Sequence, residues 1–181
     1  VAGKAREALE TMDKVLTLDP QSVDALTVAA GILDATGRKD AARSYYERAL
    51  AIEPESRHLR MSYAGNLAST GSLKEAIGVY EQLIVDFPEE QAFYQYAGIA
   101  HSYLGEYDRA ISLLRQGLAI RPTAIGYFNL AVAYEKSGDL KEAAAALKLY
   151  LEHSQGESEA FIRKARTELE NLEKKIGSRR P

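Results

Sequence analysis

The feature that most constrains this chain is a spacing: prolines recur 34 residues apart, at Pro20, Pro54, Pro88 and Pro122. Glycines keep the same step, at Gly3, Gly37, Gly71 and Gly105, and Gly138 follows 33 residues later. An alanine column accompanies them, at Ala8, Ala42, Ala76, Ala110 and Ala143. Columns that stay in register along a chain indicate a tandem array of one small structural unit.

Each period predicts two helices, because small and apolar residues recur at helical spacing on both sides of each glycine. A glycine ends the first helix of a pair, and the residue before each proline leaves helical geometry, which ends the second helix. The expected helices cover residues 4–18, 22–36, 39–52, 57–70, 73–86, 90–104, 107–120, 124–137 and 140–153.

A last helix is expected over residues 157–176, where Ser154 and Glu157 have the spacing of a capping box. Its apolar stripe consists of Phe161, Ala165, Leu169, Leu172 and Ile176. A terminal helix that is apolar on one side covers the last exposed face of a repeat array. The final residues, GSRRP, are expected to form a disordered tail.

These columns resemble the tetratricopeptide repeat, a helix–turn–helix unit of 34 residues. In the first complete unit the matching residues are Leu26, Ala29, Ala30, Leu33, Gly37, Ala42, Tyr46, Ala49 and Pro54. The resemblance implies an all-α fold, a right-handed α-solenoid of tandem helix pairs with a C-terminal capping helix. Complete repeats are expected at residues 23–56, 57–90, 91–123 and 124–156, and the capping helix with its tail at 157–181.

The chain opens in the middle of this pattern, because Gly3 stands where Gly37 stands in the next unit. Residues 1–22 are therefore expected to be the second helix of a truncated repeat, in a fragment of a longer protein. Leu9, Met12 and Leu16 are expected to be partly exposed there, and an uncovered apolar face tends to find a partner. The expected partner is a second copy, in a homodimer formed through this end.

Composition excludes several classes of protein. A net charge of −3 gives no argument for a nucleic-acid partner. No run approaches the roughly 18 apolar residues that membrane insertion needs. Cysteine is absent, which excludes disulfides, thiolate metal sites and a cysteine nucleophile. Nothing in the sequence separates a cytoplasmic from a periplasmic location, and a targeting segment would lie upstream of this fragment.

The residues that could carry chemistry are scattered. His58, His101 and His153 belong to three different repeats and share no metal-ligand spacing, and His101 is expected in the core with one ring nitrogen hydrogen-bonded. The glycines occur one per turn, so no phosphate-binding loop is formed. The sequence therefore predicts a protein without catalytic activity, metal or cofactor.

In the family that this chain resembles, the first helix of each pair lines a concave groove, which implies binding of a peptide segment or a helix of another protein. The residues expected in that groove are Thr27, Asp34, Met61, Gly65, Gln95, Ile99, Tyr103, Phe128, Val132 and Glu135. Several of them are apolar where unpartnered surface should be polar. Gly31 and Gly65 weaken their helices and are expected where a ligand backbone approaches closely.

Two alternatives stay open at this stage. The groove residues could instead fill gaps between neighbouring helices, and the array could be an accessory or oligomerisation module of a larger enzyme or envelope-assembly protein. One subtype of groove is excluded, the clamp for a C-terminal carboxylate. Its basic positions are occupied here by Thr27, Gly31, Met61, Gly65 and Gln95, which carry no positive charge.

Overall fold

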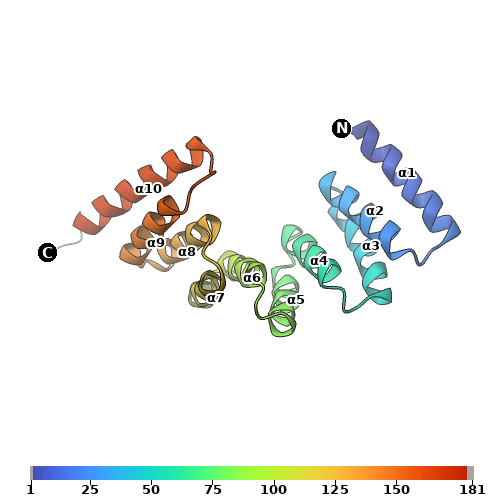
Figure 1. Cartoon of the computed structure of the whole chain (residues 1–181), viewed down its shortest axis with the longest axis horizontal. Coiled ribbons are helices and arrows are strands. Elements are labelled where there is room, and N and C mark those ends of the chain that lie inside the picture. Colours follow the sequence, from blue (N-terminus) through green and yellow to red (C-terminus); the bar gives the residue numbers. More distant parts are fainter. Residues whose placement is uncertain (1, 179–181) are drawn as a thin grey trace. The chain divides into compact units, whose positions relative to one another are not determined.

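The computed structural model describes residues 2–178, and in this part of the chain ten α-helices and no strand are found, which confirms the all-α prediction (Figure 1). The first five helices are α1 (Ala2–Leu18), α2 (Val23–Ala35), α3 (Lys39–Ile52), α4 (Arg57–Ser69) and α5 (Leu73–Asp86). The other five are α6 (Gln91–Tyr103), α7 (Tyr107–Ile120), α8 (Ala124–Ser137), α9 (Leu140–Glu152) and α10 (Glu159–Ser178). Each lies within two residues of its predicted bounds.

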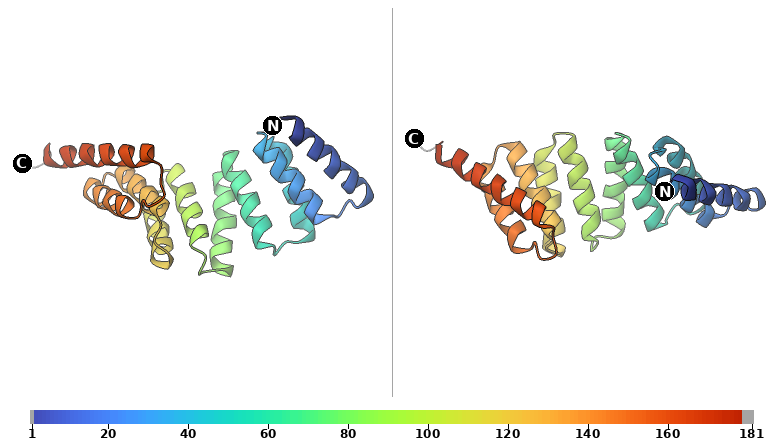
Figure 2. Two further views of the ribbon diagram at one scale, coloured as in Figure 1. Left: turned by 45° about the horizontal axis from the view of Figure 1, so that its top comes forward. Right: turned by 90° about the horizontal axis from the view of Figure 1, so that it is seen from above.

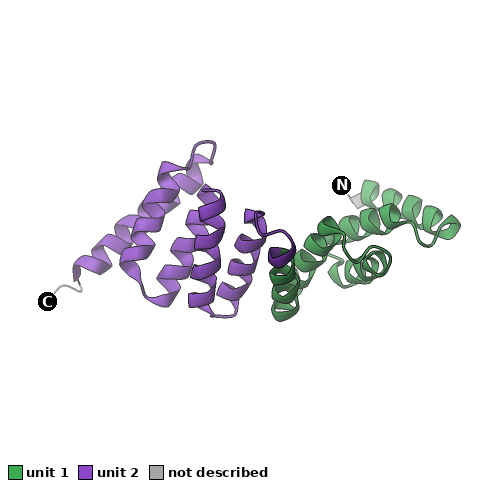
Figure 3. Ribbon diagram, turned by 60° about the horizontal axis from the view of Figure 1, so that its bottom comes forward, with its two compact units in different colours: residues 1–83 green, residues 84–181 purple. Residues whose placement is uncertain are grey.

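The helices form two compact units, residues 1–83 and residues 84–181 (Figure 3). We refer to them as unit 1 and unit 2 and describe each by itself. Unit 1 holds α1 to α4 and most of α5, and unit 2 begins with the end of α5 and holds α6 to α10.

Helix ends follow the predicted signals. Gly37 follows the end of α2 and has a φ of 79°, a left-handed conformation that costs glycine less than any other residue. Its N–H donates to the Asp34 carbonyl. Positive φ recurs at Gly71, Gly105, Gly138 and Gly156. Gly3 differs, since it lies inside α1.

One predicted helix cap is wrong. Ser154 does not cap α10; it is buried, and its hydroxyl donates to the Leu151 carbonyl at 2.8 Å. The helix starts at Glu159, and the Ser158 hydroxyl accepts from the Phe161 N–H at 3.4 Å. The reason is the turn at Gly156, whose left-handed conformation delays the helix beyond the predicted position.

The core of unit 1 is formed where α1, α2, α3 and α4 pack in succession. Ala42, the second member of the alanine column, is fully buried beside Leu33 and Tyr46. Leu9 of α1 packs against this cluster, and Leu16 packs against the neighbouring one. A larger side chain at Ala42 would force the helices apart, which is the physical reason for the alanine column.

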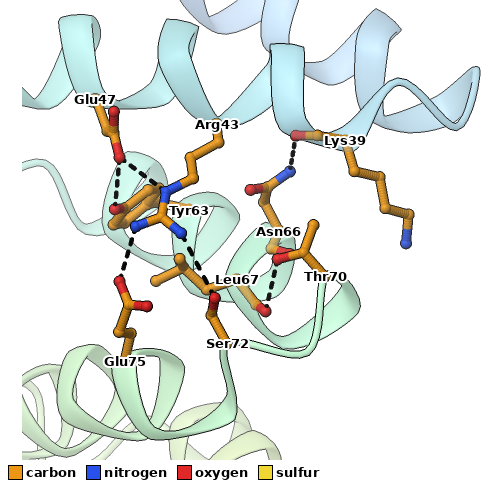
Figure 4. A network of polar contacts seen from close by, with 9 residues as sticks. All are labelled: Lys39, Arg43, Glu47, Tyr63, Asn66, Leu67, Thr70, Ser72 and Glu75. Carbon is orange, nitrogen blue, oxygen red and sulfur yellow. Dashed lines mark hydrogen bonds and ion pairs between the residues drawn. The ribbon is translucent and has the colours of Figure 1, made fainter.

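A polar network links three helices on another side of unit 1 (Figure 4). Arg43 of α3 donates to Glu47 in its own helix at 2.9 Å and to Glu75 of α5 at 2.8 Å. The Tyr63 hydroxyl of α4 donates to the same Glu47 carboxylate at 3.1 Å. These bonds to Glu47 and then Glu75 raise the pKa of Arg43 above its ordinary value. The network therefore connects α3, α4 and α5 through charge-assisted hydrogen bonds.

In unit 2 the contact between α6 and α7 is especially close. α6 packs on α7, α7 on α8 and α8 on α9, and Figure 2 shows these helices side by side. At Gly98 of α6, an added Cβ would lie 2.8 Å from Leu114 Cγ and 3.2 Å from the Ala110 carbonyl oxygen of α7. The two helices therefore approach as closely as glycine allows.

The C-terminal helix covers the last repeat as predicted. α10 packs on α9, burying Ala165 and Leu172, and Lys148 of α9 lies 2.9 Å from Glu173 of α10. Phe161 differs from the rest of the stripe, because 62% of it is exposed at the first turn of the helix. None of the helices within residues 2–178 combines the length and apolar character needed to cross a membrane.

Candidate functional site in unit 2

The ten residues predicted for the groove all lie on the first helix of a pair: α2 and α4 in unit 1, α6 and α8 in unit 2. In unit 1 these are Thr27, Asp34, Met61 and Gly65, and in unit 2 they are Gln95, Ile99, Tyr103, Phe128, Val132 and Glu135. The two sets lie in different surroundings.

Asp34 of unit 1 is held by neighbouring helices. Asn66 of α4 donates from Nδ2 to the Asp34 carboxylate at 2.7 Å and to the Lys39 carbonyl at 2.9 Å. Asp34 also bonds the hydroxyl of Tyr46 in α3, and burial together with this carboxylate raises the pKa of Tyr46 to about 12. Asn66 is 2% exposed. The Asp34 carboxylate therefore joins α2, α3 and α4.

The other three predicted residues of unit 1 offer little to a ligand. The Thr27 hydroxyl donates to the Val23 carbonyl of its own helix at 2.7 Å. Met61 is half-buried and Gly65 is exposed. An added Cβ at Gly65 would meet only the Tyr80 hydroxyl at 4.0 Å, and one at Gly31 would have no atom within 4 Å. No close approach inside unit 1 requires glycine at either position.

In unit 2 three predicted residues converge on one hollow of about 200 Å³, between α6 and α8. We call it the α6–α8 hollow; its lining residues are Ile99, Ser102, Tyr103, Tyr107, Asn129, Val132 and Lys136. Ile99, Tyr103 and Val132 are the predicted members. Tyr103 is 77% exposed and Val132 is 36% exposed, so apolar surface faces the hollow without being covered.

Two residues that matter in this hollow were not among the predicted site. The Nδ2 atom of Asn129 is buried and has no hydrogen-bond partner in the described part of the chain. Tyr107, the first residue of α7, also lines the hollow. The sequence does carry a signal for Asn129, which precedes Val132 by three residues and therefore shares its face of α8.

A second hollow of about 200 Å³ adjoins the first, because Val132 lines both. It lies between α8 and α10, and its walls include Phe128, Glu135 and Leu172. Besides Val132, the predicted members Phe128 and Glu135 line this hollow, and both are already engaged. Glu135 lies 3.5 Å from Lys175 of α10, and the Phe128 ring packs 5.7 Å from the Tyr150 ring of α9, centroid to centroid.

Gln95 does not reach the α6–α8 hollow. Its Oε1 accepts from Nε2 of Gln91 at 2.8 Å, and Gln91 in turn accepts from Arg121 at 3.5 Å. This chain of polar side chains runs along the start of α6 and the end of α7. Gln95 is therefore linked to a neighbouring turn of its own helix and is absent from the lining of the hollow.

Two of the three histidines have structural surroundings, and His58 is exposed. His101 is buried as predicted, and its Nδ1 lies 2.6 Å from a Glu106 carboxylate oxygen. His153 bonds the Leu149 carbonyl, and its ring lies 4.9 Å from the Tyr127 ring. Across residues 2–178, no cluster of three or more His, Cys, Asp or Glu side chains is arranged to hold a metal ion.

Comparison with known proteins gives one family and one fold. The sequence matches the family Tetratricopeptide repeat over residues 1–57, 33–91 and 97–158. No curated protein matches it.

Solved structures of similar fold include part of MamA from Desulfovibrio magneticus RS-1, from residue 41 to its end, with a TM-score of 0.80 and 17% identity over 87% of this chain and 89% of that chain. YrrB, described as having an unusual peptide-binding site, has a TM-score of 0.73 and 19% identity over 86% and 81% of the two chains. TTC0263, a thermophilic protein of Thermus thermophilus, has a TM-score of 0.69 and 23% identity over 94% and 91%.

Proposed function

The chain belongs to the tetratricopeptide repeat family, and from this premise we propose that it is a non-catalytic interaction module whose unit 2 binds a peptide segment of another protein in the α6–α8 hollow. Stacked helix pairs are a scaffold for binding surfaces. The proposal adds a place and a ligand class to that general role.

The observation that carries the proposal is the convergence of Ile99, Tyr103 and Val132 around one hollow beside an unpartnered amide. A binding site for a peptide combines apolar walls with a few polar groups that fix the backbone or a side chain. A tyrosine that is 77% exposed also suits an anchor, since tyrosine loses little conformational entropy and buries a large area on binding. The similarity to YrrB supports the ligand class, because that protein is described with a peptide-binding site.

The direct test is selection of random twelve-residue peptides by phage display on the immobilised chain, followed by affinity measurement on the variant Val132→Asp. A carboxylate in the wall of the hollow would be desolvated by an apolar ligand side chain, and we expect at least a tenfold loss of affinity. Val132 is preferable to Phe128 for this test, because the Phe128 ring also packs against Tyr150.

The matched control is Gly65→Asp, which puts the same side chain at the repeat-equivalent position of unit 1. It has room there, with only the Tyr80 hydroxyl within 4.0 Å of an added Cβ. We expect this variant to bind the selected peptides like the original chain, with both circular dichroism spectra unchanged. Equal binding by Val132→Asp, or an equal loss in Gly65→Asp, would contradict the proposed place.

A second candidate function is assembly through α1. Leu18 is 89% exposed and Val15 is 36% exposed on this helix, although Leu9 and Leu16 are packed against unit 1. We propose that this surface supports a homodimer or docks the array on a larger assembly. Light scattering at about 1 mM chain should give the mass of a dimer, and Leu18→Lys should give a monomer. A monomer in both samples would contradict the homodimer.

A further inference from the structure

We infer that the α6–α8 hollow recognises an acidic side chain, an aspartate or glutamate of the partner peptide that lies next to an apolar one. This inference rests on the proposed function, since it names which peptides the hollow selects. It follows from the polar groups around the hollow, taken together with its apolar walls.

The polar lining of the hollow is rich in hydrogen-bond donors. Ser102, Tyr103 and Asn129 line the hollow, and the side chain of each carries a hydrogen-bond donor. The Nδ2 atom of Asn129 is itself buried without a partner, so it meets a ligand only when that side chain turns toward the hollow. A buried N–H group without an acceptor is costly, so the site favours a ligand that supplies one. A carboxylate is the side chain with the most acceptor capacity and no donor of its own.

The charged side chain that lines the α6–α8 hollow is positive. Lys136 lies in the last turn of α8 and lines the hollow, and no ion pair to it is found in residues 2–178. Among the described lining residues none is acidic. An ammonium group beside donors and away from carboxylates attracts an anionic ligand and disfavours a lysine or arginine.

The neighbouring hollow shows the contrast. Glu135 and Glu168 line the hollow between α8 and α10, on the far side of Val132. Lys164 lines that hollow as well and Lys175 pairs with Glu135, so the charges there are mixed, whereas the only charged residue in the described lining of the α6–α8 hollow is Lys136. Val132, which both hollows share, then serves as the wall for the adjacent apolar side chain. The α6–α8 hollow is therefore the better place for the acidic side chain, with the apolar one against Val132.

The experiment uses fluorescein-labelled decapeptide libraries with leucine at position 5 and one fixed residue at both positions 3 and 7. Three libraries are made, in which that fixed residue is glutamate, glutamine or lysine. In each library the other positions are mixtures of uncharged residues and the C-terminus is amidated. A fourth library repeats the glutamine set with a free C-terminal carboxylate. Fluorescence anisotropy measures the Kd of each for the full chain, for Lys136→Gln and for Asn129→Leu.

The expected order of affinity is glutamate, then glutamine, then lysine, with glutamate about fivefold to tenfold tighter than glutamine. Lys136→Gln and Asn129→Leu should each reduce this preference, and 0.5 M NaCl should reduce it in the original chain. Lys136→Glu should reverse the order in favour of the lysine library, which a merely structural role for Lys136 would not produce.

Three outcomes would overturn the inference. Equal affinity for the glutamate, glutamine and lysine libraries, with all three lost in Val132→Asp, would refute the acidic preference and leave the proposed function intact. Binding by the free C-terminal library alone would assign the site to chain ends. No binding by any library at about 1 mM would count against the proposed function as well as against the acidic preference.

Discussion

The same repeat position is occupied differently in the two units. Gly31 and Gly65 occupy it in α2 and α4 of unit 1, and Ile99 and Val132 occupy it in α6 and α8 of unit 2. No close contact inside unit 1 requires glycine at these two positions. The two aliphatic residues of unit 2, in contrast, form walls of the α6–α8 hollow. The repeat therefore determines where a side chain stands, and the residue type determines whether that place forms the apolar wall of a hollow.

The two units also differ in the contacts of their buried polar side chains. In unit 1 the buried Asn66 joins Asp34 to α3 and α4, and the repeat-equivalent residues in unit 2 are the buried Ala100 and Ala133. In unit 2 the unpartnered amide belongs to Asn129, which lines a hollow. The Nδ2 atom of Asn66 thus holds helices of unit 1 together, although its Oδ1 atom is buried without a partner, whereas the Nδ2 atom of Asn129 makes no such link in unit 2.

The largest effect on this comparison is expected from Asn66→Ala. The substitution removes two hydrogen bonds and leaves the Asp34 carboxylate without its amide donor, which should destabilise α3 and α4 by about 3 kcal/mol. Native-state hydrogen exchange, read separately on the helices of each unit, measures this. A loss spread evenly over α6 to α9 would contradict a network confined to unit 1.

Alkaline pH should weaken unit 1 through Tyr46. Its pKa is raised from 10.0 to about 12 by burial and by Asp34, so the native state holds the proton more tightly than the unfolded chain. The contribution of protonated Tyr46 to the free energy of unfolding is fully present below pH 10. It is lost as the pH rises towards 12, at a slope of up to about 1.4 kcal/mol per pH unit.

Urea unfolding between pH 9 and pH 12 tests this, with Tyr46→Phe as the comparison chain. The variant should show a shallower decline. Some decline should persist, since burial also raises the pKa values of Tyr63 and Tyr150. Identical slopes for the two chains would contradict the role of Tyr46.

Alanine scanning of two glycines should give changes of opposite sign. Gly98→Ala forces a Cβ to within 2.8 Å of Leu114 and should destabilise unit 2 by about 2 kcal/mol. Gly65→Ala has free space and a better helix propensity, and should stabilise unit 1 by about 0.5–1 kcal/mol. Thermal unfolding of the two variants and of the original chain measures both changes in stability. Destabilisation by Gly65→Ala would mean that a contact requires glycine at that position.

The smallest effect is expected at the surface of unit 2. Lys148 and Glu173 form an ion pair at 2.9 Å between α9 and α10, with both side chains about half exposed. Lys148→Gln should change the free energy of unfolding by less than about 1 kcal/mol, and less in high salt. A larger loss would show that the attachment of α10 depends on charge more than on Ala165 and Leu172.

Most of the fold follows from the sequence, because glycine, proline and alanine act through local geometry that is the same in every repeat. Helix bounds, the turns after Gly37 and Gly71 and the burial of Ala42 could all be predicted. The start of α10 could not, since the turn at Gly156 competes with the capping signal at Ser154.

The candidate site was predictable only in part. Ile99, Tyr103 and Val132 were found because apolar residues on an otherwise polar face stand out in a periodic sequence. Asp34 and Glu135 were placed on the same face, but their charges are used by Asn66 and Lys175, whose side chains come from other helices. Asn129 needed the structure, since an amide without a partner is visible only when its neighbours are known.

The central claim is that unit 2 binds and unit 1 does not, and NMR titration tests it most directly. The ¹⁵N-labelled chain would be titrated with the tightest peptide from the display selection. We predict that amide shift changes concentrate in α6, α8 and the start of α7, around Ile99, Tyr107 and Val132, while α2 and α4 are unaffected. Changes concentrated in α2 and α4, around Gly31 and Gly65, would contradict the account.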